Sequence, residues 1–129
     1  MTNPCDLSAT EARRLIGTRE LSPVELLDSC IAQIGRINPT VNAVTGTDFE
    51  RATQAAKAAE QAVQRKRPLG PLHGLPLGIK DLNETEGLLT TYGSPIYKDY
   101  IPTHDESVVA TLRAAGAIIF CKTNVPVFG

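Results

Sequence analysis

The sequence has little of what metal centres, redox pairs and cofactor sites are made of. Its 129 residues include only 2 histidines and 3 cysteines. His73 and His104 lie far apart, and Cys5, Cys30 and Cys121 have neither metal-ligand nor redox spacing. We therefore expect no metal ion and no organic cofactor, and we take a reducing cytoplasm as the default location.

Strong charge and long apolar runs are also missing. The formal net charge is -1, which gives no electrostatic reason to expect direct binding of nucleic acid or of an acidic membrane surface. No stretch approaches the length of a bilayer-spanning helix. The amino terminus, with its early Pro4 and Asp6, does not resemble a signal peptide. The composition is that of a globular chain of at most one domain.

Residues 1–67 have the pattern of three amphipathic helices with short links. The helix starts are capping boxes at Ser8–Glu11, Ser22–Glu25 and Thr47–Glu50, and the ends are Gly17, Asn38-Pro39 and Pro68. Between the second and third helices, residues 41–45 fit a short strand or an extended link. Taken alone, this helical segment would suggest a bundle.

The pattern of residues 68–129 predicts instead a strand, a helix and a second strand. Leu77–Lys80 fits a short strand, a capping box at Thr103–Glu106 opens a helix, and Ala117–Cys121 is a continuous apolar run typical of a strand covered on both faces. The inward residues of that helix are predicted to be Val108, Val109, Leu112 and Ala115. This order implies parallel pairing with a right-handed crossover.

The fold class predicted for the whole chain is α/β. Amino-terminal helices are followed by the start of a mixed, largely parallel sheet flanked by helices. A sheet of two or three strands with one crossover helix leaves strand edges and a face uncovered, and residues 122–129 end in a mostly apolar run. The pattern is that of the front part of a larger α/β protein.

Lys80 is the candidate functional residue, and two interpretations of it stay open. Lysine is seldom fully buried unless it is paired, which favours a solvated turn residue. However, Lys80 falls at the carboxyl end of a parallel strand, the edge where open α/β sheets bind ligands. The long connection over residues 81–102 also fits a functional or mobile loop.

The stretch GPLHGLPLGIKD, followed by EGLLTTYGS and LRAAGAIIFCKTN, resembles the amino-terminal part of the amidase signature family. The upstream ELSPVELLDSCIAQIGRINPTVNAV resembles it too, so the likeness covers nearly the whole chain. The resemblance implies a mixed sheet flanked by helices, a small-molecule amide substrate, and a Ser, cis-Ser, Lys catalytic triad. It makes residues 1–129 the amino-terminal part of a single amidase domain.

Of that triad, only Lys80 has a counterpart here. Both serines lie in the family beyond the point corresponding to Gly129, so the isolated chain is expected to be inactive. A lysine can take a proton only in its neutral form, and burial among Leu77, Ile79 and Leu82 is expected to lower the pKa of Lys80. Lys80 would then take a proton from the bridging serine, which takes one from the nucleophile.

The other residues of this region receive structural interpretations first. Asp81 is predicted to cap a turn or the backbone, and Lys122 is given a structural role only. The small-residue loop of residues 90–94 either faces the catalytic edge or forms a turn, and Ser94 is not the nucleophile by position. The polar Leu82–Thr85 departs from the family's pattern and leaves substrate preference open.

Three functions remain open at this point. The first is a simple amidase acting on small or aryl amides, and the second is the glutaminase component of a tRNA-dependent amidotransferase. The third, from another class, is a truncated, non-catalytic binding module. For partners, a homodimer and a missing carboxy-terminal portion are both open alternatives.

Overall fold

The centre of the molecule is a three-stranded sheet in the order β1-β3-β2, formed by β1 (Val44–Thr47), β3 (Ile118–Thr123) and β2 (Pro76–Lys80). The computed structural model describes residues 3–129. β2 pairs with β3 in parallel, as predicted, and β1 pairs with β3 antiparallel. The sheet is therefore mixed. Its central strand is β3, which contains most of the apolar run predicted over residues 117–121.

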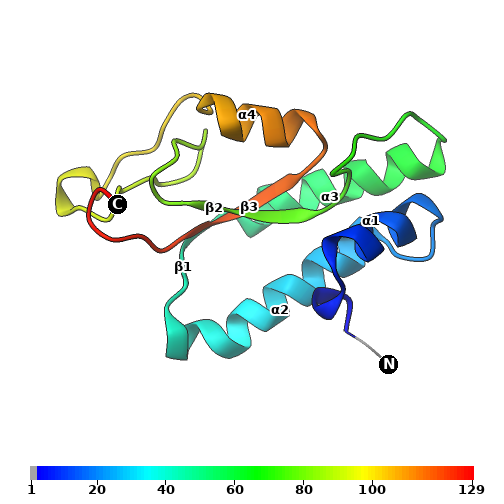
Figure 1. Cartoon of the computed structure of the whole chain (residues 1–129), viewed down its shortest axis with the longest axis horizontal. Helices are drawn as coiled ribbons and strands as arrows, with labels where there is room; N and C mark the ends of the chain where they lie inside the picture. Colours follow the sequence, from blue (N-terminus) through cyan, green and yellow to red (C-terminus); the bar gives the residue numbers. More distant parts are fainter. Residues whose placement is uncertain (1–2) are drawn as a thin grey trace.

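Within residues 3–129, four α-helices surround this sheet in layers (Figure 1). They are α1 (Ala9–Gly17), α2 (Pro23–Val41), α3 (Phe49–Gln64) and α4 (Ser107–Ala114), with short 3₁₀ helices η1 (Pro4–Asp6) and η2 (Pro95–Tyr97). α2 and α3 pack on one face, where Leu27, Ala56 and Phe120 share a buried cluster. α4 covers the other face, where Val109 packs with Ile79 and other buried residues. The small alanines of α3 allow it to approach the sheet closely.

The first two helices begin where the capping boxes predicted. The hydroxyl of Ser8 accepts a hydrogen bond from the backbone N–H of Glu11 at 3.1 Å, and the hydroxyl of Ser22 accepts one from Val24 at 3.0 Å. α3 begins one residue later than predicted, because the carboxylate of Asp48 caps it.

The predicted end of α2 at Asn38-Pro39 was wrong. The helix continues through Pro39 to Val41 and ends at Asn42, which adopts the left-handed conformation with φ of 50°. The side chain of Asn38 instead bonds the backbone of Val44 in both directions, at 2.8 and 3.0 Å. These two hydrogen bonds hold the turn between α2 and β1.

The predicted capping box at Thr103–Glu106 was also wrong. α4 begins at Ser107, and neither the Thr103 hydroxyl nor the Glu106 carboxylate caps it. As a result Val108, which was predicted to point inward, is 48% exposed, while Val109 is fully buried. The carboxylates of Asp105 and Glu106 bind the loop after β2 instead, through the backbone N–H of Glu86 and Glu84.

None of the helices within residues 3–129 combines the length and apolarity needed to cross a bilayer. The same residues hold no cluster of three or more His, Cys, Asp or Glu side chains arranged for a metal ion. His73 and Cys121 both have structural surroundings: His73 Nε2 lies 2.9 Å from the carbonyl of Ala59, and burial raises the pKa of Cys121 to about 11.

Candidate active site at the carboxyl edge of the parallel strands

Two lysines lie where the parallel strands β2 and β3 end. The register pairs Ile79 with Lys122 and Lys80 with Thr123, so the two lysines are one register step apart on neighbouring strands. The carboxyl ends of parallel strands form the edge at which open α/β sheets place their ligands. This edge, with the loop of residues 81–102, is the candidate site.

Lys80 is exposed, so its predicted burial among Leu77, Ile79 and Leu82 was wrong. Ile79 is buried, but it points into the cluster that it forms with Leu88 and Val109 under α4. Side chains alternate between the two faces of a strand, which places Lys80 away from that cluster. The catalytic role of Lys80 remains a prediction.

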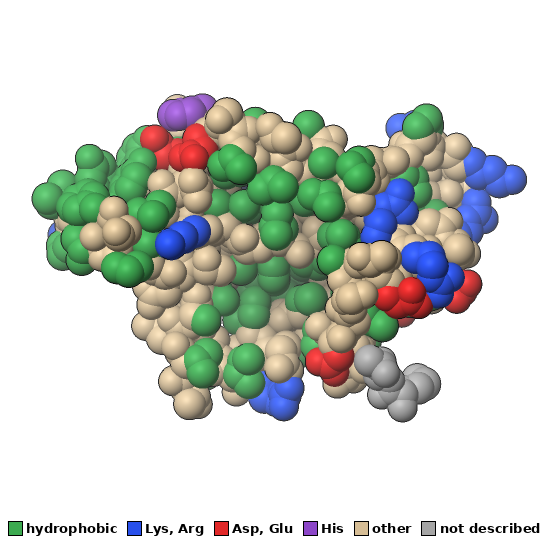
Figure 2. All heavy atoms as spheres, viewed as in Figure 1, with side chains coloured by type: hydrophobic (Ala, Val, Ile, Leu, Met, Phe, Trp, Pro, Cys, Tyr) green, Lys and Arg blue, Asp and Glu red, His purple; other side chains and the backbone are tan. Residues whose placement is uncertain are grey.

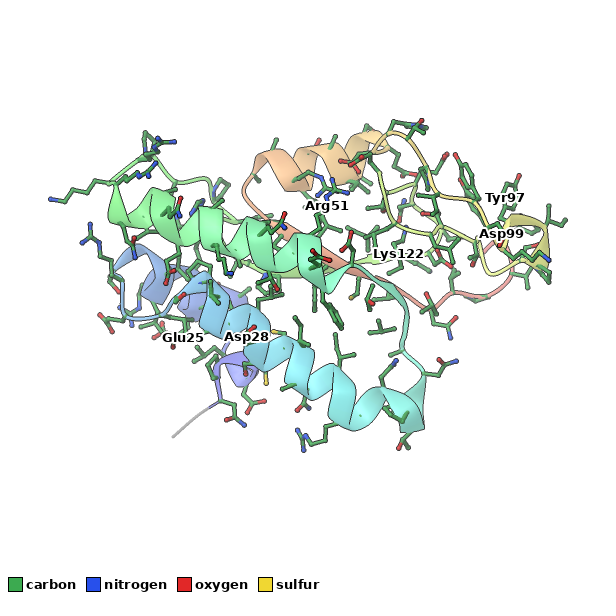
Figure 3. All side chains as sticks on the ribbon, turned by 180° about the vertical axis from the view of Figure 1, so that it is seen from behind. Glu25, Asp28, Arg51, Tyr97, Asp99 and Lys122 are labelled. Carbon is green, nitrogen blue, oxygen red and sulfur yellow. The ribbon has the colours of Figure 1, made fainter. Side chains whose placement is uncertain are left out.

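The buried cation of this edge is Lys122, which has no exposed surface. Its ammonium donates to the carbonyl of Asn83 at 2.5 Å, to Thr85 Oγ1 at 2.9 Å and to Thr90 Oγ1 at 3.1 Å. Burial lowers the pKa of Lys122 to about 8. Figure 3 labels Lys122 near the carboxyl end of β3, on the side of the molecule that carries the loop after β2.

Asp81 fulfils the predicted role of a backbone cap. Its side chain is 2% exposed and accepts hydrogen bonds from the backbone N–H of Thr91, at 2.9 Å, and from the Thr91 hydroxyl. Its own backbone N–H donates to Thr123 and its carbonyl accepts from Tyr92. Asp81 therefore joins the end of β2 to both β3 and the small-residue loop.

The small-residue loop of residues 90–94 is held by backbone contacts. Ser94 caps η2 by accepting from the N–H of Ile96 at 3.2 Å, so its hydroxyl has a structural role. Gly93 has φ of 68°, and a Cβ there would lie 2.9 Å from the carbonyl oxygen of Val125. Only glycine fits that contact without strain, and it lets the segment after β3 pack on this loop.

Beside this loop, Glu84 lies within a group of tyrosines. Tyr100 donates its hydroxyl to the Glu84 carboxylate, and this bond lowers the pKa of Glu84. Burial, and then Glu84, raises the pKa of Tyr92 to about 12. These tyrosines are therefore neutral donors at physiological pH.

Large apolar side chains are exposed over η2 and the carboxy-terminal segment (Figure 2, left). They are Ile96, Tyr97, Ile101, Val127 and Phe128, of which Ile96 is 80% exposed. Tyr97 and Phe128 join the two segments by an edge-on contact with ring centroids 6.2 Å apart. This exposed apolar surface borders the candidate site.

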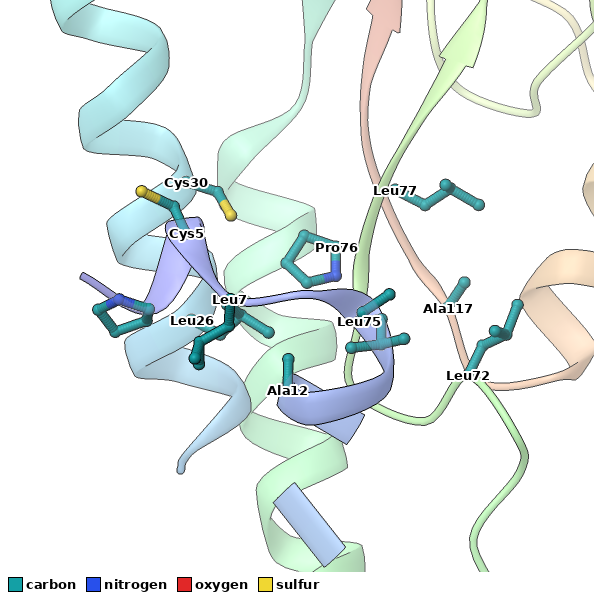
Figure 4. Close-up of a pocket in the computed structure, with 12 residues that line it drawn as sticks. Cys5, Leu7, Ala12, Leu26, Cys30, Leu72, Leu75, Pro76, Leu77 and Ala117 are labelled. Carbon is teal, nitrogen blue, oxygen red and sulfur yellow. The ribbon is translucent and has the colours of Figure 1, made fainter. Parts of the chain in front are cut away.

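The apolar groove of the molecule lies elsewhere (Figure 4). Its volume is about 270 Å³, and its lining includes Leu7, Leu26, Leu75 and Leu77. Because Pro76 and Leu77 begin β2, the groove borders the amino end of that strand, whereas Lys80 lies at the other end. We therefore do not assign it to the candidate active site.

Comparison with known proteins decides the family. The model of the family described as Amidase matches residues 25–129. This chain belongs to the Amidase family. It is 39% identical over 123 residues to an acylamidase of Rhodococcus erythropolis, covering 95% of this chain and 26% of that protein. It is 42% identical over 121 residues to a glutamyl-tRNA(Gln) amidotransferase subunit of Azoarcus sp. strain BH72, covering 94% of this chain and 25% of that protein.

Solved structures of amidases have the same fold over this region. A bacterial aryl acylamidase of the amidase signature family superposes with a TM-score of 0.88 at 28% identity, covering 95% of this chain and 26% of that one. A protein from a vestigial complex related to the origins of an s-triazine catabolic enzyme superposes with a TM-score of 0.90 at 31% identity, covering 95% and 27%. The chain thus spans about a quarter of the length of the relatives it matches.

Sequence reasoning missed the burial of Lys122. A signal for it existed, because Lys122 directly follows the run Ile118–Cys121, just as Lys80 directly follows a short apolar strand. Lys122, like Lys80, is therefore a lysine at the carboxyl end of a predicted parallel strand. The strand β3 in fact continues through Lys122 to Thr123, two residues beyond its predicted end.

Proposed function

We propose that this chain supplies the lysine-bearing part of an amidase that hydrolyses a small carboxylic amide to an acid and ammonia or an amine. The observation that carries the proposal is the position of Lys80, in the stretch GIKD, at the carboxyl end of a parallel strand within the region matched by the Amidase family. As a member of that family, the chain is assigned the general class of amide hydrolases.

The proposed chemistry assigns one proton path. A nucleophilic serine attacks the amide carbonyl while a bridging serine takes its proton and passes one of its own to the neutral amine of Lys80. The C–N bond then breaks as a proton returns along the same path to the leaving nitrogen. A water molecule finally cleaves the ester left on the nucleophilic serine, which releases the acid and restores the serine hydroxyl. The exposed position of Lys80 leaves it accessible to a serine-bearing segment.

In this proposal residues 1–129 alone are inactive, and both serines belong to a part of the amidase domain outside these residues. The cytoplasm is the proposed location. A second candidate is the glutaminase component of a tRNA-dependent amidotransferase, which the 42% identity to a subunit of such an enzyme favours. The substrate separates the two, since the first releases amine from aryl amides and the second releases ammonia from glutamine.

The test is a chimera in which this chain replaces the matching quarter of the Rhodococcus erythropolis acylamidase. We expect the chimera to hydrolyse an aryl amide, and a Lys80→Met substitution to lower kcat by about 10³-fold or more. Lys98→Met, which alters an exposed lysine after η2, is the matched control and should leave activity unchanged.

Two outcomes would contradict the proposal. One is a folded chimera that releases no amine, and the other is a chimera that works equally well without Lys80. Either would give preference to the non-catalytic binding module, with the exposed apolar surface over η2 as its contact surface. Release of ammonia from glutamine but no amine from aryl amides would favour the glutaminase candidate.

A further inference from the structure

Lys122 is a buried cation whose three hydrogen-bond partners are all neutral oxygens. Its ammonium has three N–H groups, and the carbonyl of Asn83 and the hydroxyls of Thr85 and Thr90 accept them. Thr85 and Thr90 have no exposed surface either. Every donor of the ammonium is therefore used, inside a shell that excludes water.

The hydroxyls of Thr85 and Thr90 can only accept hydrogen bonds from Lys122, because each donates its own hydrogen elsewhere. Thr85 donates its own hydrogen to the carbonyl of Asn83 at 3.0 Å, and Thr90 donates its hydrogen to the carbonyl of Leu88 at 3.1 Å. A neutral amine has only two N–H groups, so one of these three contacts would be lost on deprotonation. The charged form of Lys122, which prevails below its pKa, therefore fills all three contacts.

The carboxylates that act on this ammonium come from two segments. They are Asp81 and Glu84 in the loop after β2, and Asp105 and Glu106 before α4. All four favour the charged form and oppose the desolvation that lowers the pKa of Lys122. Their carboxylates bind backbone N–H groups, Arg113 or Tyr100, so they offset the charge of Lys122 from a distance.

The contacts of Lys122 lead directly to the turn that presents Lys80. The backbone N–H of Asn83 donates to the carbonyl of Lys80 at 3.0 Å, which closes the turn after β2. The carbonyl of the same Asn83 receives the ammonium of Lys122. One residue therefore connects the buried lysine of β3 with the exposed lysine of β2.

We propose that Lys122 is the positioning residue of this site: its ammonium fixes the loop of residues 83–90 against β3 and thereby holds the turn that presents Lys80. The significance of this role for catalysis rests on the proposed function of Lys80. The positioning itself is a property of this chain and can be measured without any activity.

The first experiment measures amide hydrogen exchange by NMR on the whole chain. In Lys122→Met, exchange at the N–H of Asn83 and of Thr91 should rise at least about tenfold more than at Ile118, whose N–H bonds the carbonyl of Leu75 in the sheet. Thr90→Val, which removes one acceptor but keeps the lysine, should produce the same pattern more weakly. The control Lys98→Met should change none of the three.

Two exchange results would overturn the proposal. In the first, Asn83 and Thr91 exchange as slowly in both variants as in the unsubstituted chain. In the second, all three amides accelerate by one common factor, because Lys122 would then support global stability and not this loop. If Lys122→Met does not fold, exchange at Asn83 and Thr91 relative to Ile118 in Thr90→Val decides whether Lys122 positions the loop.

The second experiment uses the acylamidase chimera. Lys122→Met should lower kcat at least about tenfold while KM stays within about twofold, because a misplaced lysine affects turnover more than substrate binding. Loss of activity without faster exchange at Asn83 and Thr91 would contradict positioning and indicate direct participation. If the unsubstituted chimera is inactive, the proposed function fails, while the exchange experiment still decides the role of Lys122.

Discussion

Lys80 and Lys122 occupy matching places at the ends of neighbouring parallel strands, yet their surroundings are opposite. Lys80 is exposed, whereas Lys122 has no exposed surface and three hydrogen-bond acceptors. The difference arises because Lys122 is paired with Ile79 and Lys80 with Thr123, so the two side chains lie on opposite faces of the sheet, and residues of the loop after β2 bind only Lys122. Whether a lysine at a strand end is accessible to a ligand or buried as a structural contact therefore depends on the residues that pack over it.

The pH dependence of stability is the strongest test of this difference. The pKa of Lys122 is lowered from 10.5 to about 8, so between these values the unfolded chain binds a proton that the folded chain has released. The free energy of unfolding attributable to Lys122 should therefore rise with pH across this window, by about 3 kcal/mol in total. Chemical denaturation from pH 7.5 to 10.5 measures it.

Other groups titrate in the same range, so the comparison must be with matched variants. Lys122→Met should lack this rise, and Lys80→Met should retain it. Tyr92, whose pKa is raised to about 12, lowers stability as pH increases above 10, because the unfolded chain releases the tyrosine proton first. Equal slopes in all three proteins would show that Lys122 is not the buried cation described here.

The two lysines should also differ in what their removal does to folding. Lys122→Met leaves two buried threonine hydroxyls and the half-buried carbonyl of Asn83 without their shared donor, and we expect it to lower the free energy of unfolding at pH 7 by about 2 kcal/mol. Lys80→Met replaces an exposed side chain and should stay within about 0.5 kcal/mol. Urea denaturation followed by circular dichroism measures both, and a larger loss for Lys80→Met would reverse the comparison.

Much of the fold could be predicted from local sequence patterns. The starts of α1 and α2 followed from their capping residues, and the parallel pairing of β2 with β3 followed from the order of strand, helix and strand. These features depend on neighbouring residues or on general rules of connection. The prediction of where α4 begins was wrong because the carboxylates of Asp105 and Glu106 accept hydrogen bonds from the backbone of a distant loop and do not cap their own helix.

The surroundings of the candidate site could not be predicted in the same way. The partners of Lys122 precede it by 39, 37 and 32 residues, and no periodicity connects positions so far apart. The exposure of Lys80 likewise depends on which face of the sheet the loop covers. Position at a strand end was visible in the sequence, while burial was decided by tertiary contacts.

The smallest expected change in stability comes from Asp81, which follows Lys80 directly and acts on the charge of Lys122. Asp81→Asn keeps the shape of the side chain but replaces a charge-assisted hydrogen bond to Thr91 by a neutral one, which should lower the free energy of unfolding by about 1 kcal/mol. Asp81 is also the leading carboxylate that favours the charged form of Lys122. Its neutralisation should therefore move the alkaline rise in stability to lower pH.

Asp99→Asn, which alters an exposed carboxylate after η2, is the matched control and should leave both the stability and the position of that rise unchanged. The informative quantity is the midpoint of the rise, taken from denaturation curves at closely spaced pH values. A loss of stability with an unchanged midpoint would mean that Asp81 acts on the loop alone, through Thr91. A midpoint that moves to lower pH would mean that the exposed and the buried strand ends are coupled electrostatically as well as through Asn83, because Asp81 follows Lys80 directly.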